Sequence, residues 1–411
     1  MRLLVFTTLF PRPSSPHHGI FVLERLRHWR DATGGEAVVV APVPFVPGAL
    51  ARGRFAEFAD VPAEEQRDGF RVLHPRYLLL PKVSMTVAPW LLARAGVAAA
   101  RRLAAAGERF DLVDAHYLYP DAVAAVAVAR ELALPLCVTA RGTDVNLIPR
   151  HALPRRWLRW MLRNADAAIA VAEALRREVV ALAPAGLECV TLRNGVDLEK
   201  FRPVERAAAR TELGWERDGA IVVSVGHLIE RKGHHHLIAA LPQLPGVRVK
   251  LVGDGEWRGR LEAQARAAGV ADRVAFVGRL PHERLHVAYS AADALSLLSS
   301  REGWPNVLLE SLASGTPVAA TRVFGTPEVV RDDAVGVLVG APTPAAVAAA
   351  LRGLLEAPLD RAAIRAYAER HSWQETVAGM QALFERVIAR RRGPAAASVA
   401  GRASPRPEPS R

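Results

Sequence analysis

One stretch of the 411-residue chain decides its fold class: Ser299-Ser300-Arg301-Glu302-Gly303-Trp304-Pro305-Asn306-Val307-Leu308-Leu309-Glu310. It follows an apolar run that reads as a strand ending near Leu298, and it opens a helix whose first turn accommodates Pro305. Free N–H groups at a helix start favour phosphate. Glu302 and Glu310 bracket that start. Taken alone, two such glutamates are also typical of helix capping and solvated charge, so the stretch predicts a strand–helix unit with a polar edge.

Short apolar runs alternate with longer amphipathic runs on both sides of this stretch, a pattern typical of parallel sheets covered by helices. We expect strands at residues 2–7, 37–41, 70–74, 111–115, 136–139, 167–171 and 188–192. After a proline- and charge-rich stretch the pattern restarts, with strands at residues 220–225, 247–252, 273–276, 294–298, 317–320 and 336–339. The chain is therefore predicted to be an α/β protein with two doubly wound, Rossmann-like parallel-sheet domains that face a cleft.

The expected domain organisation has four parts. Residues 1–195 form the first domain, and residues 196–371 form the second. Residues 372–392 form a helix that we expect to cross back onto the first domain. Residues 393–411 are rich in Ala, Pro, Ser and Arg, which predicts a disordered tail.

The composition is that of a folded, enzyme-sized protein. Half of the residues are apolar, 23% are charged and 6% are aromatic, which excludes a disordered chain. The formal net charge is +12. In the last 26 residues seven arginines face a single glutamate, so the rest of the chain is only mildly basic. A nucleic-acid-binding protein concentrates positive charge on a folded face, so no nucleic-acid partner is expected.

The expected compartment follows from the cysteines and the apolar runs. Cys137 and Cys189 lie in strand-like segments, where cysteine acts as a small hydrophobe, and this indicates a reducing environment. The apolar start of the chain is too short for a signal peptide. The longest uncharged run, residues 334–351, is interrupted by glycines and prolines. We therefore expect a cytoplasmic protein without a transmembrane helix.

The opening stretch resembles the Glu-x7-Glu signature of the retaining, two-domain glycosyltransferases of glycosyltransferase family 4, which have the GT-B fold. Glu302 and Glu310 have this spacing. Residues 224–233, Ser-Val-Gly-His-Leu-Ile-Glu-Arg-Lys-Gly, resemble the family's Gly-Arg-Leu-x3-Lys-Gly segment. The resemblance places Lys232 on the lysine that binds the donor diphosphate. His227 stands where the family usually has arginine, and Arg231 is an adjacent source of positive charge.

Further family landmarks follow in order along the chain. Residues 16–21 resemble the first-domain glycine turn at Gly19, and His116 corresponds to a histidine that contacts the donor sugar. Residues 141–144, Arg-Gly-Thr-Asp, resemble the loop after the next strand. Residues 194–197 match the Pro-Asn-Gly-Val-Asp linker with Arg193 in place of proline, and residues 324–328 resemble a Gly-x-Pro-Glu loop near the diphosphate.

The resemblance implies a set of site residues. The catalytic set is Glu302, His116 and Lys232. The donor-binding set is Gly19, Arg231, Lys232, Glu302, Gly303, Trp304, Pro305, Asn306 and Glu310. Further candidate contacts are His227, Arg141, Asp144, Gly278, Arg279 and Gly325. Two structural interpretations stay open as alternatives to donor contacts. A lone strand-end histidine such as His116 is often structural, and Arg141 and Asp144 can pair with each other.

No metal or other cofactor is expected. The chain has no Asp-x-Asp metal motif of this enzyme class. His234, His235 and His236 are consecutive, so they point in different directions and lack the i, i+4 spacing that puts two ligands on one helix face.

The implied activity is a retaining, hexosyltransferase-type glycosyl transfer (EC 2.4). The donor would be a nucleoside-diphosphate sugar, and the acceptor a saccharide or a lipid-linked molecule. The sequence looks most similar to bacterial members that act in teichuronic acid or exopolysaccharide biosynthesis. Three alternatives stay open: a sugar-nucleotide epimerase of the same architecture, a glycoside phosphorylase, and a non-catalytic protein that binds a membrane or polymer. The phosphorylase would need a pyridoxal phosphate lysine, and the chain has only four lysines.

The segment from Pro154 to Arg163 combines four arginines and two tryptophans at helical spacing. This pattern suits peripheral contact with an anionic membrane surface. An ordinary surface helix with its tryptophans in the core is the competing interpretation.

Overall fold

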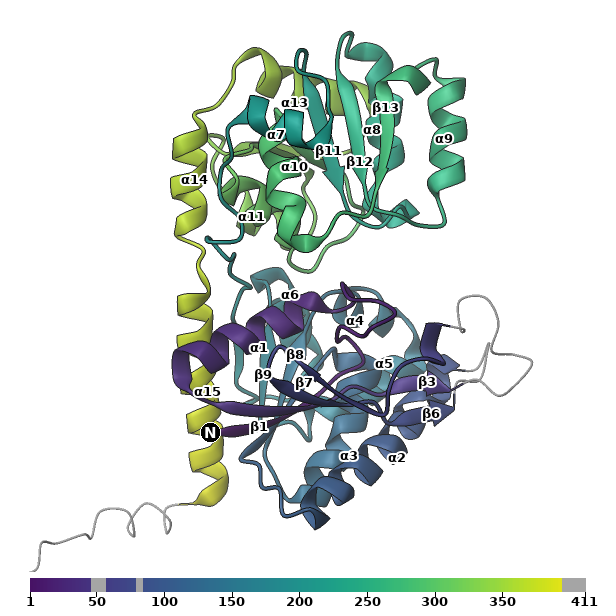
Figure 1. The fold of residues 1–411 in the computed structure, drawn as a ribbon. Coiled ribbons are helices and arrows are strands. Elements are labelled where there is room, and N and C mark those ends of the chain that lie inside the picture. The colour runs from purple at the N-terminus through teal and green to yellow at the C-terminus, as the bar shows by residue number, and fades with distance from the viewer. Residues whose placement is uncertain (46–56, 79–83, 394–411) are drawn as a thin grey trace, which may run out of the picture.

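The computed structural model describes residues 1–45, 57–78 and 84–393. The chain folds into two α/β units, stacked one above the other in Figure 1, with a long helix along one side. Each unit is a mainly parallel sheet covered by helices, as the alternating pattern predicts.

The first unit is built on a sheet that has eight strands among the described residues, in the order β10-β9-β8-β7-β1-β2-β5-β4. All neighbours pair in parallel except β4 and β5. The strands are β1 (Arg2–Phe6), β2 (Glu36–Val40), β4 (Glu64–Arg67), β5 (Phe70–Leu73), β7 (Leu112–His116), β8 (Leu136–Ala140), β9 (Ala167–Ala170) and β10 (Cys189–Thr191). The helices are α1 (Ile20–Thr33), α2 (Ser84–Ala105), α3 (Val123–Leu132), α4 (Thr143–Asn146), α5 (Ala152–Leu162) and α6 (Glu173–Leu182).

Three strands of this unit were not predicted. Strand β4 reads Glu-Glu-Gln-Arg and lies antiparallel at the sheet edge, so it has none of the apolar residues that mark the buried strands. Strands β3 (Val43–Phe45) and β6 (Arg76–Leu78) are three residues each and pair with each other as a separate ribbon. Such short elements carry too little periodicity for detection.

The second unit contains a fully parallel sheet with strand order β13-β12-β11-β14-β15-β16. The strands are β11 (Ile221–Val225), β12 (Arg248–Val252), β13 (Val274–Gly278), β14 (Ala294–Leu297), β15 (Val318–Thr321) and β16 (Gly336–Val339). The helices are α7 (Arg206–Leu213), α8 (His234–Ala240), α9 (Arg258–Ala267), α10 (Leu285–Ala291), α11 (Asn306–Ala313), α12 (Thr326–Val329), α13 (Pro344–Glu356) and α14 (Arg361–Glu369). The strand order reverses between β11 and β14, where ligands bind in Rossmann-like sheets.

Burial on both faces explains why these strands read as continuous apolar runs. Every residue of β11 is buried. Val223 and Val225 belong to the core on one face of the sheet, whereas Val222 belongs to the core on the other. In a parallel sheet the connecting helices cover both faces, so side chains on both faces of a strand are buried and apolar.

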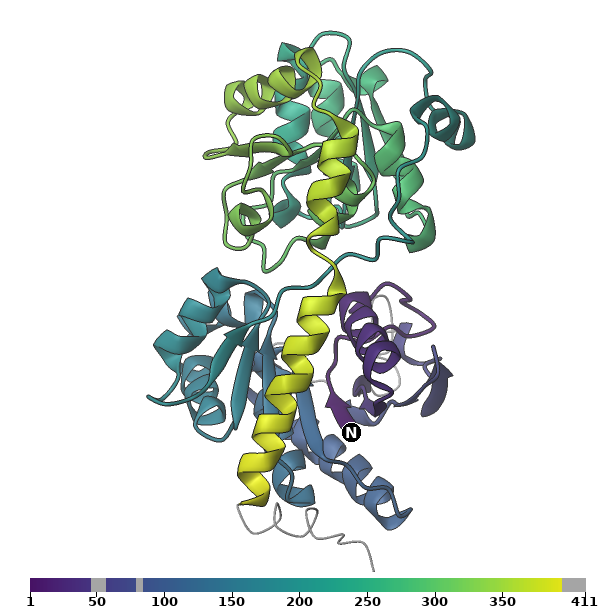
Figure 2. The same cartoon turned by 90° about the vertical axis from the view of Figure 1, so that its left-hand side faces the viewer.

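Helix α15 (Trp373–Arg392) leaves the second unit and packs along the first, as Figure 2 shows in yellow. Met380, Leu383 and Phe384 are buried in the same core as Leu3 and Val5 of β1. The expected disordered tail lies outside the described residues beyond Gly393. Among the described helices, none combines the length and the apolar character needed to cross a bilayer.

The two connections between the units cross at one point. The Val196 N–H donates to the His371 carbonyl at 2.9 Å. A Cβ at Gly195 would lie 2.4 Å from the backbone nitrogen of Trp373, so only glycine allows the two chains to pass this closely. We call this crossing, at Gly195, Val196, His371 and Trp373, the crossover of the two connections.

Candidate active site

Lys232 and Glu302 meet at the point where the strand order of the second unit reverses. Lys232 lies in the loop after β11, and Glu302 lies in the loop after β14, its neighbour in the sheet. The Lys232 Nζ lies 2.7 Å from Glu302 Oε1, and Arg231 NH1 lies 3.6 Å from the same oxygen. The fold therefore brings together the three charged residues that the sequence placed at the donor diphosphate and sugar.

The Glu302 carboxylate stays ionised despite its position. Burial raises the pKa of Glu302, but the positive charges of Lys232 and Arg231 lower it more. The pKa of Glu302 therefore lies below the ordinary glutamate value of 4.5. The Arg231 guanidinium also donates to the Arg301 carbonyl at 3.0 Å, which ties the two loops together. The site thus presents a fixed carboxylate beside two cations.

Gly303 and Gly325 lie where the two units touch. A Cβ at Gly303 would lie 1.9 Å from the Arg141 carbonyl oxygen of the first unit. A Cβ at Gly325 would lie 2.2 Å from the Gly303 carbonyl oxygen and 3.1 Å from the Ala172 Cβ. Both glycines are therefore required by close packing around the Gly303 loop, in addition to any contact with a donor.

Helix α11 begins at Asn306, directly after Pro305. Pro305 is therefore the N-cap residue that precedes the helix, instead of occupying the first turn as predicted. Its side chain makes no capping hydrogen bond. Trp304 is buried, and its Nε1 donates to the Asn194 carbonyl at 2.9 Å. The indole thus holds the start of α11 against the linker.

Glu310 lies in the interior of α11 with two polar partners from α10 and the turn before it. Tyr289 OH donates to Glu310 Oε2 at 2.8 Å, and His282 Nε2 lies 3.4 Å from Oε1. Burial lowers the pKa of His282, but the Glu310 carboxylate raises it more, so it lies above 6.5. Neither partner was predicted from the sequence, since both lie more than 20 residues before Glu310.

His116 is the last residue of β7 and is only 2% exposed. Arg141 NH2 donates to its Nδ1 at 2.8 Å, and its Nε2 lies 3.1 Å from Asp114 Oδ2. Burial lowers the pKa of His116 to about 4, so the ring is neutral at pH 7. The structure therefore holds His116 in a buried network with Arg141 and Asp114. Alternation along β7 places Asp114 on the same face, a signal available in the sequence.

Arg141 and Asp144 do not pair through their side chains. The Asp144 carboxylate accepts from the backbone N–H groups of Leu118, Arg141 and Gly142 at 2.7–3.1 Å. Burial raises the pKa of Asp144. The Arg141 guanidinium instead binds His116 and Asn194. Asp144 therefore shapes the loop, and Arg141 reaches the histidine and the linker.

The remaining predicted residues are Gly19 in the first unit and His227, Gly278 and Arg279 in the second. Gly19 has a φ of 67° and caps α1, and a Cβ there would lie 2.3 Å from the Leu9 carbonyl oxygen, so its observed role is in packing. His227 as a whole residue is exposed, but its ring is partly desolvated, and this desolvation together with nearby Arg279 and Lys232 lowers its pKa. A Cβ at Gly278 would enter open space. Arg279 is exposed directly after Gly278.

His234 is structural in the described structure. It is 2% exposed; its Nδ1 lies 3.0 Å from Ser224 Oγ and its Nε2 lies 3.2 Å from the His227 carbonyl. The rings of His235 and His236 pack on each other, with His235 also against Trp257.

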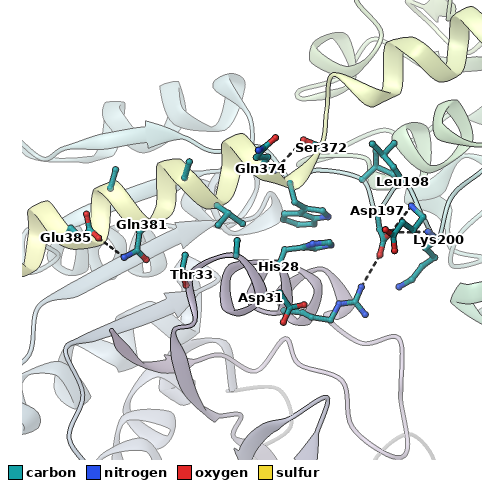
Figure 3. Close-up of a pocket in the computed structure, with 18 residues that line it drawn as sticks. His28, Asp31, Thr33, Asp197, Leu198, Lys200, Ser372, Gln374, Gln381 and Glu385 are labelled. Carbon is teal, nitrogen blue, oxygen red and sulfur yellow. Dashed lines mark hydrogen bonds and ion pairs between the residues drawn. The ribbon is translucent and has the colours of Figure 1, made fainter.

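One group of possible metal ligands occurs among the described residues, close to the crossover of the two connections: Glu24, His28 and Asp197. Its carboxylates already have cationic partners, since Lys200 Nζ lies 2.7 Å from Glu24 and Arg27 NH2 lies 3.1 Å from Asp197. His28 and Asp197 line a groove of about 1210 Å³ between α1, the linker and α15, shown in Figure 3. The expectation of a metal-free protein stays a prediction.

The same architecture occurs in solved structures. Sucrose-phosphate synthase of Thermosynechococcus elongatus superposes with a TM-score of 0.75 at 22% identity, over 94% of this chain and 98% of that one. Anabaena HepE in complex with UDP-glucose gives 0.70 at 20% identity, over 94% and 99%. The two facing parallel-sheet units therefore define a protein of GT-B fold.

Two family models place the chain more narrowly. Glycosyltransferase Family 4 matches residues 19–200, and Glycosyl transferases group 1 matches residues 205–371. The chain belongs to the glycosyltransferases that carry these two domains, which confirms the resemblance seen in the sequence.

Curated relatives agree with this assignment. The D-inositol 3-phosphate glycosyltransferase of Segniliparus rotundus is 38% identical over 207 residues, which cover 47% of this chain and 46% of that protein. The Bacillus subtilis protein TuaC, named for teichuronic acid biosynthesis, is 27% identical over 331 residues, which cover 79% and 82%. The chain thus matches about half the length of the first relative and most of the second.

Proposed function

We propose that the chain is a retaining glycosyltransferase. It moves a sugar from a nucleoside-diphosphate sugar to a saccharide or lipid-linked acceptor, in the biosynthesis of cell-surface polysaccharide or glycoconjugate. The observation that carries the proposal is the Lys232–Glu302 contact of 2.7 Å at the strand-order reversal of the second unit. A nucleotide-sugar donor is supported by HepE, whose structure contains UDP-glucose.

The charges of the site suit stretching of the bond between sugar and diphosphate. As this bond lengthens, negative charge grows on the leaving diphosphate. Lys232, Arg231 and the free N–H groups at the start of α11 can stabilise it. These groups supply the positive charge from the chain itself, so we propose transfer without a metal or other cofactor.

Glu302 is proposed to orient the sugar hydroxyls. Its carboxylate is ionised, because its pKa lies below 4.5, and it is held in place by Lys232. An ionised carboxylate next to the sugar also favours the positive charge that develops on the ring. Retention would follow if the acceptor attacks from the face that the diphosphate leaves.

His116 and Glu310 are proposed to act at the two ends of the donor. A neutral His116 at the end of β7 lies beside Arg141, whose backbone contacts the Gly303 loop. Glu310, held by Tyr289 and His282, is proposed to bind the ribose. Gly278 is the last residue of β13 and Arg279 follows it, and both are proposed to contact the base.

A donor-only incubation tests the proposal and separates it from the epimerase alternative. The transferase is expected to release free sugar and nucleoside diphosphate slowly, with the donor's anomeric configuration in the first product seen by proton NMR. Conversion of the donor into a second sugar nucleotide would support the epimerase instead. Release of the inverted anomer would contradict retention.

We further propose that the first unit contacts the inner face of an anionic membrane. Helix α5 exposes Arg155, Arg156 and Arg159, and no acidic partner for them lies among the described residues. Four of the five large apolar side chains that are exposed among these residues lie on a connected set of elements that includes α5: Leu153 on α5, Trp90 on α2, which contacts α5, Leu78 on β6, which contacts α2, and Phe45 on β3, which pairs with β6. Trp157 and Trp160 are half-buried and pack edge to face, so they also contribute to the core. Arginines beside exposed apolar groups suit a lipid-linked acceptor.

A further inference from the structure

The linker that leads from the first unit to the second, residues 193–197, contacts helix α12 through an ion pair of Arg193. Arg193 Nε and NH2 donate to Glu328 Oε2 at 2.9 and 2.5 Å. The guanidinium also lies 5.8 Å from the centre of the Trp304 indole. The family motif has proline at the position of Arg193. The ion pair with Glu328 therefore depends on a residue in which this chain departs from the motif.

Glu328 in turn caps a helix of the other unit. Helix α6 begins at Glu173, and its N-cap residue, Ala172, has no side-chain oxygen for the free N–H groups. Glu328 Oε2 accepts from the Glu173 N–H at 3.0 Å, and Oε1 accepts from the Ala174 N–H at 2.9 Å. A carboxylate at this position is also favoured by the helix dipole. One side chain therefore joins the linker, α6 and α12.

Asn194, the next residue of the linker, joins the two units by a second route. Its Oδ1 accepts from Arg141 NH1 of the first unit at 3.3 Å. Its Nδ2 donates to Asn306 Oδ1 at 3.2 Å, and its carbonyl accepts from Trp304 Nε1 at 2.9 Å. Asn194 is only 4% exposed, so water competes weakly for these contacts.

We propose that Arg193, Asn194 and Glu328 form an interdomain clamp that holds residues 303–306 of the second unit against the Arg141 loop of the first. The proposal rests on the function proposed above, in which the two loops must act on one donor sugar. The three residues are positioning residues, since they act through the Gly303 loop, α6 and Arg141. Lys232, Arg231 and Glu302 all lie in the second unit, so binding of the donor diphosphate beside them does not require the clamp.

Distances between the units test the clamp without any ligand. Spin labels are placed at Glu178→Cys on α6 and Ala263→Cys on α9, in a chain whose own thiols are removed by Cys137→Ser and Cys189→Ser. The labelled protein in which Arg193, Asn194 and Glu328 are unchanged is expected to give one narrow distribution of distances between the two labels. Arg193→Ala and Glu328→Gln are each expected to broaden it toward longer distances. Unchanged distributions in both variants would overturn the proposal.

A matched control removes an ion pair that lies within one unit. Arg101 Nε lies 2.9 Å from Glu131 on the surface of the first unit, so Arg101→Ala is expected to leave the distance distribution unchanged. Broadening in this control equal to that in Arg193→Ala would show general loosening and would also overturn the clamp.

Kinetics then connect the clamp to transfer. Arg193→Ala is expected to lower kcat at least tenfold while the donor KM changes less than threefold. An Arg193→Ala, Glu328→Gln double variant is expected to lose less activity than the two single effects added together, since the two substitutions share the Arg193–Glu328 contact. A kcat equal to that of the unsubstituted chain would overturn the positioning role. If no donor is turned over at all, the proposed function fails, while the spin-label distances still report on the clamp.

Discussion

The Lys232–Glu302 pair is the residue-scale feature on which the proposed chemistry depends. Lys232→Ala and Glu302→Ala are each expected to lower turnover by well over tenfold, because oxyanion-type stabilisation contributes ~3 kcal/mol. Initial rates with the preferred donor and circular dichroism spectra check this result. Arg258→Ala, which removes a surface ion pair with Glu262 on α9, is the control and should leave the rate unchanged. Full activity in either site variant would rule out the assignment.

His282 links protein stability to pH. Its pKa in the folded protein lies above 6.5 because the Glu310 carboxylate outweighs burial. The stabilisation is complete below pH 6.5 and is lost as the pH rises through the folded-state pKa. The free energy of unfolding of the wild type should therefore exceed that of His282→Gln by more at pH 6 than at pH 8.5. Urea titrations at both pH values measure it; an equal difference at the two values would show that His282 does not carry the effect.

At the scale of elements, helix α15 is part of the core of the first unit. Phe384 is fully buried against strands and α1 in that core. Phe384→Ala should lower the free energy of unfolding of the first unit by about 3–5 kcal/mol, through lost burial and the cavity left behind. Denaturant unfolding checks this value, with Gln374→Ala at an exposed position of the same helix as the control. A loss below about 1 kcal/mol would mean that α15 is only loosely attached.

Helix α5 carries the prediction about membranes. Replacing Arg155, Arg156 and Arg159 together by Gln should weaken binding to phosphatidylglycerol vesicles by on the order of 100-fold, since each arginine near an anionic surface is worth ~1 kcal/mol. Co-sedimentation with these vesicles, and with phosphatidylcholine vesicles for comparison, measures the effect. The control replaces Arg258, Arg260 and Arg266 on α9 by Gln. Equal binding by both triple variants would contradict a membrane face at α5.

Most elements were predictable because their residues are buried on two faces. The strands of both sheets appear within one or two residues of their predicted positions, as in β16, which was predicted at residues 336–339. Strand β4 was missed because an exposed edge strand can be entirely polar. The helix start at residue 305 was wrong by one position, since Pro305 has a ψ of 83° and is the N-cap residue, and α11 begins at Asn306.

At the scale of the whole molecule, the contacts between the units could not be predicted from local pattern. Glu328 and Glu173 are 155 residues apart in sequence, and Asn194 and Asn306 are 112 apart. The family resemblance predicted Lys232 and Glu302 as one site, and the fold brings them together because they follow neighbouring strands of one sheet. Local pattern could not predict the burial of His116, whose ring contacts Arg141 and Asp114.

The central claim is that the crevice beside Lys232 binds the diphosphate of a nucleotide sugar. The most direct measurement is a thermal-shift series with UDP, GDP, ADP and their common sugar conjugates on the wild type and on Lys232→Ala. Binding to the folded state raises Tm according to ligand concentration and affinity. We predict that one nucleotide series stabilises the wild type and that Lys232→Ala loses most of this shift. No shift with any nucleotide at millimolar concentration, or an equal shift in the variant, would contradict the claim.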